Sequence, residues 1–86
     1  MSRHATNKAR YERGREYTNR IKLERGCIDC GYKAFAAALH FDHVDPATKK
    51  VAVSKLRCGS IAGLDAEIAK CVVRCANCHA VRTWND

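Results

Sequence analysis

The sequence lacks the features that would place it in a membrane or outside the cell. No apolar run approaches the length of a membrane span, and the first residues lead into charged positions without a signal-peptide stretch. We therefore expect a cytoplasmic, reducing setting and no membrane partner. The few aromatic residues give no platform for stacking single-stranded bases. With 86 residues there is room for one domain with a small core, which a structural metal would help to stabilise.

Positive charge is concentrated in the N-terminal part of the chain. Residues 1–25 contain eight Lys and Arg against three Glu, whereas residues 26–86 contain eight against six acidic residues. A positive field attracts polyanions and accelerates their association, which favours a nucleic-acid partner over an anionic lipid surface. The solvated face of a soluble helix would have a similar composition, so charge alone leaves both interpretations open.

The same N-terminal part is predicted to be helical. Residues 5–24 contain no proline and are rich in Arg, Lys and Glu, and Gly26 stands where a helix commonly ends. The apolar stripe of this helix, which includes Tyr11, Tyr17 and Ile21, is thin, so the helix needs a partner. The rest of the domain, a second copy of the chain and a DNA groove are all candidates.

Two strands and two further helices are predicted beyond this arm. Residues 37–43 alternate apolar and polar side chains as a strand does, and Asp45 with Pro46 ends that pattern. Ser60 is placed to cap a short helix. The apolar residues 71–74 form a second strand candidate, and a short polar helix is expected after them.

Four cysteines form two CxxC pairs, Cys27 with Cys30 and Cys75 with Cys78, separated by 44 residues. Each pair supplies two thiolates from one turn, so the four together can close a tetrahedron around Zn²⁺. Four sulfur ligands leave no open position, which predicts a structural zinc that joins the two halves of the domain. Two disulfides are the competing interpretation, and a reducing setting disfavours them.

Two cysteines lie outside this pattern, and one motif has a second interpretation. Cys71 falls in an apolar segment as a small buried side chain would, while Cys58 is a loop thiol to which we assign no role. The second CxxC pair with His79 also matches the attachment motif of c-type haem. Met1 is the only methionine and no export signal is present, so haem attachment is the weaker interpretation.

Asp42, His43 and His79 form a candidate catalytic group. Asp42 and His43 end the first predicted strand and His79 follows the second CxxC pair, so a zinc site would bring the two segments together. A carboxylate and a neutral imidazole suit Mg²⁺ or a similar ion, and an imidazole near neutral pH suits a general base. Successive strand residues face opposite sides, so Asp42 and His43 can share one site only where the strand ends and bends. Taken singly, each has an ordinary structural explanation.

Three segments of the chain carry these residues in a recognisable combination. They are Leu39-His-Phe-Asp42-His43-Val-Asp-Pro46, Glu67-Ile-Ala-Lys70-Cys71 and Cys75-Ala-Asn77-Cys78-His79-Ala-Val-Arg82-Thr83. Over about residues 27–84 they resemble HNH endonucleases of the phage and bacterial type. The resemblance implies an α+β protein with the small ββα-metal (His-Me finger) fold and a four-cysteine zinc knuckle. It also implies a metal-dependent DNA endonuclease in which His43 is the general base and Asp42 and His79 hold Mg²⁺ or Mn²⁺.

The chain departs from the family pattern at one position. Many members have an asparagine about nine residues before the final histidine, where this chain has Lys70. Asn77 resembles the asparagine of the subgroup with the Cys-Ala-Asn-Cys-His form, and would orient the base or the metal loop. Lys70 and Arg82 are candidate phosphate contacts. His40 shares a strand face with Asp42, and we expect it to be peripheral.

The resemblance implies a zinc-stapled nuclease domain at residues 27–86, preceded by a basic N-terminal helical arm at residues 1–26. Arginines of the arm would contact the DNA backbone without reading its sequence, and this binding would weaken with salt. A homodimer through or near this helix is left open, and the expected location is the cytoplasm of a bacterial cell or of a phage-infected host. The alternative is a non-catalytic zinc-ribbon DNA-binding module, in which Asp42, His43 and His79 have no chemical role.

Overall fold

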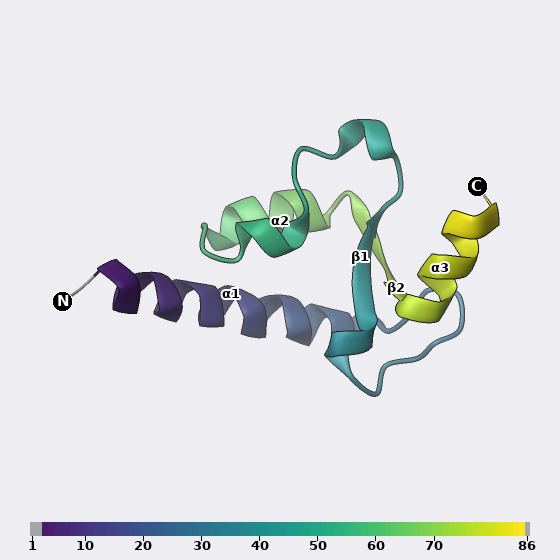
Figure 1. Ribbon diagram of the computed structural model, residues 1–86, viewed down its shortest axis with the longest axis horizontal. Coiled ribbons are helices and arrows are strands. Elements are labelled where there is room, and N and C mark those ends of the chain that lie inside the picture. The colour runs from purple at the N-terminus through teal and green to yellow at the C-terminus, as the bar shows by residue number, and fades with distance from the viewer. Residues whose placement is uncertain (1–2, 86) are drawn as a thin grey trace.

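The chain is an α+β protein with two antiparallel strands. A computed structural model describes the backbone of residues 3–85 and the side chains of residues 8–85. The elements in order are helix α1 (Arg3–Arg25), strand β1 (Leu39–His43), helix α2 (Ile61–Ile68), strand β2 (Cys71–Cys75) and helix α3 (Ala76–Asn85), with 3₁₀ turns at Ala36–Ala38, Pro46–Thr48 and Val53–Leu56. The sheet lies in the middle of the molecule, with α3 at the end opposite the start of α1 (Figure 1). The predicted helices and strands are confirmed, with shifts of a few residues at their ends.

Strand β1 pairs with β2 in a regular antiparallel register that runs from Leu39 opposite Cys75 to His43 opposite Cys71. It begins two residues later than the alternation predicted, because the alanines at 36–38 form a 3₁₀ turn. Alanine favours helical over extended backbone, and none of these three alanines is buried. The two strands make up the whole sheet within residues 3–85, so one edge of β1 has no strand partner.

Two small groups of buried side chains form the core. One contains Leu39 and Val73 together with Cys27 and Cys75. The other lies between the sheet and α2 and contains Val53, Leu64, Ile68 and Cys71. Ser60 caps α2 as predicted, because its Oγ accepts a hydrogen bond from the Gly63 N–H at 3.0 Å. The cap sets the start of α2, and with it the helical phase that turns Leu64 and Ile68 toward the sheet.

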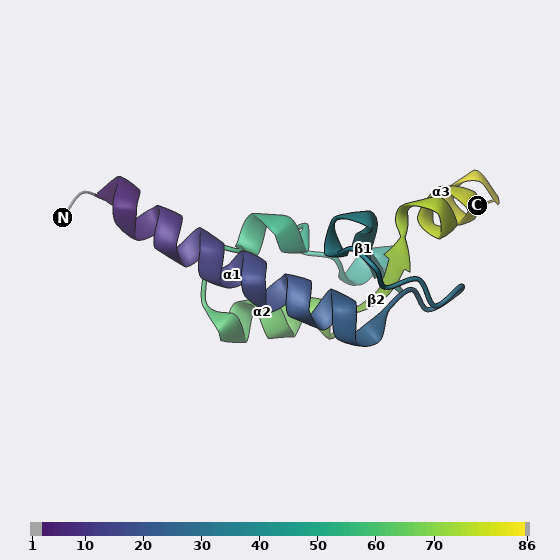
Figure 2. The same ribbon diagram turned by 90° about the horizontal axis from the view of Figure 1, so that it is seen from below.

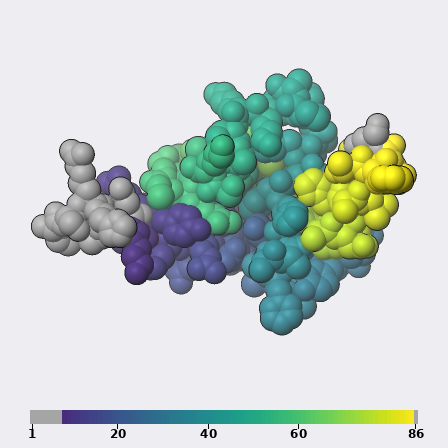
Figure 3. Space-filling model, viewed as in Figure 1, coloured from purple at the N-terminus to yellow at the C-terminus, as the bar shows by residue number. Residues whose placement is uncertain are grey.

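Helix α1 packs along the rest of the domain. Figure 2 shows it running past α2 toward the sheet, and in Figure 3 its side chains lie against those of α2. Tyr17 donates a hydrogen bond to Asp65 of α2, and the Lys22 ammonium lies 5.4 Å from the centre of the Phe41 ring. Thr18 is fully buried in this contact. Neither α1 nor any other helix within residues 3–85 has the length and apolar character needed to cross a membrane.

At Gly14, α1 lies close against the segment before α2. A Cβ atom added there would lie 2.1 Å from the backbone oxygen of Arg57, far inside van der Waals contact. We therefore expect Gly14→Ala to lower the free energy of unfolding by about 1–3 kcal/mol, although alanine favours a helix by up to about 1 kcal/mol. Denaturant unfolding measures the change.

The matched control for Gly14→Ala is Gly63→Ala in α2. A Cβ at Gly63 would lie 3.2 Å from the Ser60 Oγ, a side-chain atom that needs to move only a few tenths of an ångström. This variant should stay within about 1 kcal/mol of the wild type. Equal stability of the two variants would show that α1 does not need the close approach at Gly14.

Candidate functional site

The predicted gathering of the four cysteines is confirmed. The Sγ atoms of Cys27, Cys30, Cys75 and Cys78 all lie within 4.8 Å of one another, and those of Cys30 and Cys75 are 3.7 Å apart. Zinc–sulfur bonds of 2.3 Å in a tetrahedron place the sulfur atoms about 3.8 Å apart. The four cysteines are therefore clustered suitably for a structural Zn²⁺.

Local backbone geometry forms this cluster. Gly31 has a φ of +80°, which lets the turn after Cys30 fold back so that the Cys27 N–H bonds the Tyr32 oxygen at 2.8 Å. On the other side, the Cys78 N–H lies 3.4 Å from the Cys75 Sγ. Cys27 and Cys30 lie in the loop after α1, Cys75 ends β2 and Cys78 lies in the first turn of α3. The cluster therefore joins the loop after α1 to the start of α3.

The thiols of the cluster have strongly shifted acidities. Burial opposes ionisation of Cys27, but hydrogen bonds from backbone N–H groups, that of Cys75 first, lower its pKa to about 6. The pKa of Cys78 is raised, mainly through its side-chain hydrogen bond with Cys75. Thiolates this close repel one another, and a divalent cation at their centre removes the conflict. The donor set therefore fits zinc.

The two remaining cysteines lie outside the cluster. Cys71 is buried between the sheet and α2, and burial raises the pKa of its thiol to about 11. This confirms the prediction of a small buried side chain. Cys58 is exposed in the loop before α2.

The predicted catalytic residues of β1 point to opposite faces of the sheet. Asp42 and His43 are both in the regular ladder, opposite Val72 and Cys71, so the strand does not bend between them. Asp42 shares its face with His40, whereas His43 shares the inner face with Leu39. The bend that would bring Asp42 and His43 to one point is not formed within β1.

The residue that meets His79 is His40. Their Nδ1 atoms lie 3.1 Å apart and the rings are nearly perpendicular. Burial and the neighbouring charge of His79 lower the pKa of His40. His40, expected to be peripheral, is the side chain that contacts His79.

Asp42 is held by arginines. Its Oδ2 accepts a bond from Arg74 Nη1 at 2.7 Å and lies 3.9 Å from Arg82 Nε. Arg74 also binds Asp29 at 2.8 Å, so the two carboxylates and one buried guanidinium form a continuous chain. Asn77 is exposed in the first turn of α3. Within residues 8–85, the four cysteines are the one group of three or more ligand side chains arranged to share an ion.

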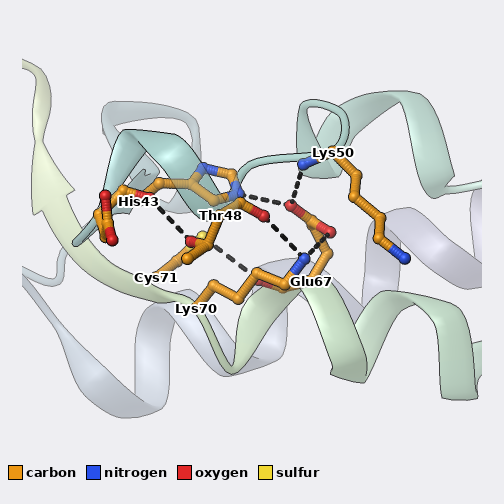
Figure 4. A network of polar contacts seen from close by, with 7 residues as sticks. His43, Thr48, Lys50, Glu67, Lys70 and Cys71 are labelled. Atoms are coloured by element: carbon orange, nitrogen blue, oxygen red, sulfur yellow. Dashed lines mark hydrogen bonds and ion pairs between the residues drawn. The ribbon is translucent and has the colours of Figure 1, made fainter.

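His43 is bound to a carboxylate that the sequence analysis did not assign. Its Nε2 lies 2.7 Å from Glu67 Oε2, and the two side chains are only 7% and 4% exposed. The Lys70 ammonium donates to the other oxygen of Glu67, Oε1, at 3.0 Å, and the backbone N–H of Lys50 donates to Oε2 at 3.2 Å (Figure 4). The bond from Lys70, followed by the bond from His43, lowers the pKa of Glu67 to about 2. Its place on the apolar side of α2, between Leu64 and Ile68, was the available sequence signal.

A groove of about 570 Å³ runs between α1, β1 and the segment before α2. Its lining includes the cationic side chains of Arg15, Lys22, Lys49 and Arg57. The described residues that line it include no Asp or Glu. Burial, together with the charge of Arg57, lowers the pKa of Lys22. Both His40 and His43 line the groove, although they lie on opposite faces of β1.

Comparison with protein-family models, with curated proteins and with solved structures gave no significant match.

Proposed function

We propose that this protein is a metal-dependent DNA endonuclease of the HNH type, which hydrolyses phosphodiester bonds. The groove carries the proposal. Four cationic side chains and two histidines line it, with Lys22 and His43 largely buried in its wall, and among the described residues that line it there is no carboxylate to repel a phosphate. Such a surface attracts the DNA backbone and places imidazoles beside it.

Three histidines have roles in the proposal: His40 and His43 line the groove, and His79 lies outside its lining but contacts His40. His43 is the general base that accepts a proton from the attacking water. His79 is a ligand of the catalytic Mg²⁺ or Mn²⁺, with His40 beside it at 3.1 Å. Asp42 would join that ion by exchanging its bond to Arg74 for one to the metal. When bound, the ion polarises the phosphate and stabilises the charge of the departing oxygen.

We propose a structural zinc for the four-cysteine cluster. The zinc would hold the turn at Cys27 and Cys30 against the start of α3. Since His79 directly follows Cys78, the same bonds would set its position beside His40. The arginines of α1 and those of the groove would bind successive phosphates, and the partner is DNA. The groove lies along α1, so arm and domain would contact the same backbone.

A non-catalytic zinc-binding DNA-binding module is the second candidate. Two observations favour it: Asp42 is neutralised by Arg74, and His43 is engaged by Glu67. In that case both residues stabilise the fold, and the groove binds the backbone without cutting it.

Cleavage of supercoiled plasmid tests the proposal. With Mg²⁺ or Mn²⁺, we expect the wild-type protein to nick the plasmid, because one site of this kind cuts one strand. With EDTA we expect no cleavage. His79→Ala should cut at least about 100-fold more slowly, equivalent to about 2.7 kcal/mol of lost transition-state stabilisation. His40→Ala should raise the metal concentration needed for half-maximal cleavage.

Val81→Ala is the matched control, since Val81 is exposed on the same helix. It should cut like wild type, and all variants should keep their zinc content. If no metal supports cleavage while wild type and variants shift DNA equally in a gel, the binding module is the better account.

A further inference from the structure

Glu67 is a carboxylate at a core position. It is 3% exposed and projects from α2 between the buried Leu64 and Ile68. Burial of an ionised carboxylate is unfavourable unless its oxygens are paired and hydrogen-bonded. Both oxygens of Glu67 are: Oε1 binds Lys70, and Oε2 binds His43 and the Lys50 N–H. A carboxylate held this firmly has a fixed orientation.

The bond to His43 determines which ring nitrogen carries the proton. Glu67 is ionised at neutral pH and can only accept hydrogen bonds, so the Nε2 of His43 must be the N–H at 2.7 Å. In the neutral ring, Nδ1 then has the free lone pair. Figure 4 shows the ring of His43 directed edge-on toward Glu67, which fixes its rotation as well as its tautomer.

The cation of Lys70 balances this arrangement. Its Nζ lies 3.0 Å from Glu67 Oε1 and donates to the Thr48 backbone oxygen at 2.9 Å. The carboxylate thus shares its negative charge between Lys70 and His43. Lys70 also joins α2 to the loop after β1, so the position of Glu67 relative to the strand is constrained from two sides.

We propose that Glu67 is a positioning residue for His43, holding the ring as the Nε2–H tautomer so that Nδ1 accepts the proton of the attacking water in the groove. The inference rests on the proposed nuclease function. It assigns Lys70 to support of Glu67 in place of a phosphate contact. A carboxylate that orients a histidine base in this way contributes through geometry and touches neither water nor DNA.

Nitrogen-15 NMR of the histidine side chains in the zinc-bound wild-type protein tests the tautomer directly. We expect the neutral form of the His43 ring, observed across a pH titration, to carry its proton on Nε2 and none on Nδ1. In Glu67→Ala the ring should become a mixture of tautomers. A wild-type Nδ1–H tautomer, or spectra unchanged by Glu67→Ala, would overturn the inference without any measurement of cleavage.

Kinetics test the catalytic part. Glu67→Ala should lower kcat by about 10–100-fold and leave KM for DNA near the wild-type value. Glu67→Gln, whose amide oxygen still accepts from Nε2–H, should restore part of the rate and keeps the measurement valid if the alanine variant folds poorly. Asp65→Ala is the matched control, because Asp65 lies on the same helix and contacts Tyr17 instead.

The outcomes separate this inference from the function on which it rests. If wild type cuts DNA and Glu67→Ala cuts at the same rate, Glu67 has no positioning role and the nuclease proposal stands. If wild type cuts no DNA with any metal, the nuclease proposal fails and this inference fails with it.

Discussion

Removal of the metal from the four-cysteine cluster is expected to unfold the protein. Structural zinc sites have apparent binding free energies of about 10–16 kcal/mol, which equals or exceeds the whole stability of most small domains, about 5–15 kcal/mol. The core near the cluster is too small to compensate. Of its four buried residues, Cys27 and Cys75 are themselves expected ligands, which leaves Leu39 and Val73.

Circular dichroism measures the loss of structure, first during titration of the wild type with a strong chelator and then in Cys75→Ser, whose zinc content is measured as well. We expect the helix signal to be lost cooperatively during chelation and to be low in Cys75→Ser. In the wild type it should recover when zinc is returned. Cys58→Ser is the matched control, because Cys58 is exposed and outside the cluster. It should keep its zinc and its fold. A native spectrum after complete removal of zinc would show that the metal is not structural.

Replacement of His43 is expected to have the largest effect on activity. Loss of a general base typically slows a reaction by about 10²–10⁴-fold. His43→Ala would also leave Glu67 buried with one partner fewer, at a cost of about 1–3 kcal/mol. His43→Gln is therefore the sharper variant, since its side-chain N–H can still bind Glu67 while the amide cannot act as a base.

Plasmid cleavage and a gel shift at low salt measure this prediction. Both His43 variants should bind DNA like wild type and cut at least about 100-fold more slowly. Val44→Ala, at an exposed position next in the chain, is the control and should cut normally. Full cleavage by a folded His43→Gln protein would rule out His43 as the base, and with it the central chemical step of the proposed function.

Local patterns predicted most of the secondary structure. The charge-rich, proline-free arm forms α1, Ser60 caps α2, and the apolar segment at 71–74 forms most of β2. The CxxC spacing predicted the four-cysteine cluster, because each pair is confined to one turn and one ion suits four sulfurs. The helices and strands depend on residues near one another in the chain. The cluster depends on four sulfur side chains that suit a single ion. The alanines at 36–38 did not extend the strand, since alternation was outweighed there by backbone preference.

The arrangement of the candidate site was decided by tertiary structure. The register of β1 places Asp42 and His43 on opposite faces, and the docking of α3 brings His79 to His40, which lies near Asp42 on the same strand face. Glu67 gained its partner through the helical phase of α2 relative to the strand. None of these follows from spacing along the chain.

The sequence by itself determined the elements, the excess of positive charge and the four cysteines that cluster. The three-dimensional packing decided which side chains meet. It brings α1 close to the backbone of Arg57 at Gly14, places His40 and His43 in the lining of one cationic groove, and pairs His43 with a buried carboxylate. The physical reason is that secondary structure and metal-ligand spacing are set by short-range geometry. Contacts between elements depend on register and helical phase, which small changes in packing shift by a whole residue or face.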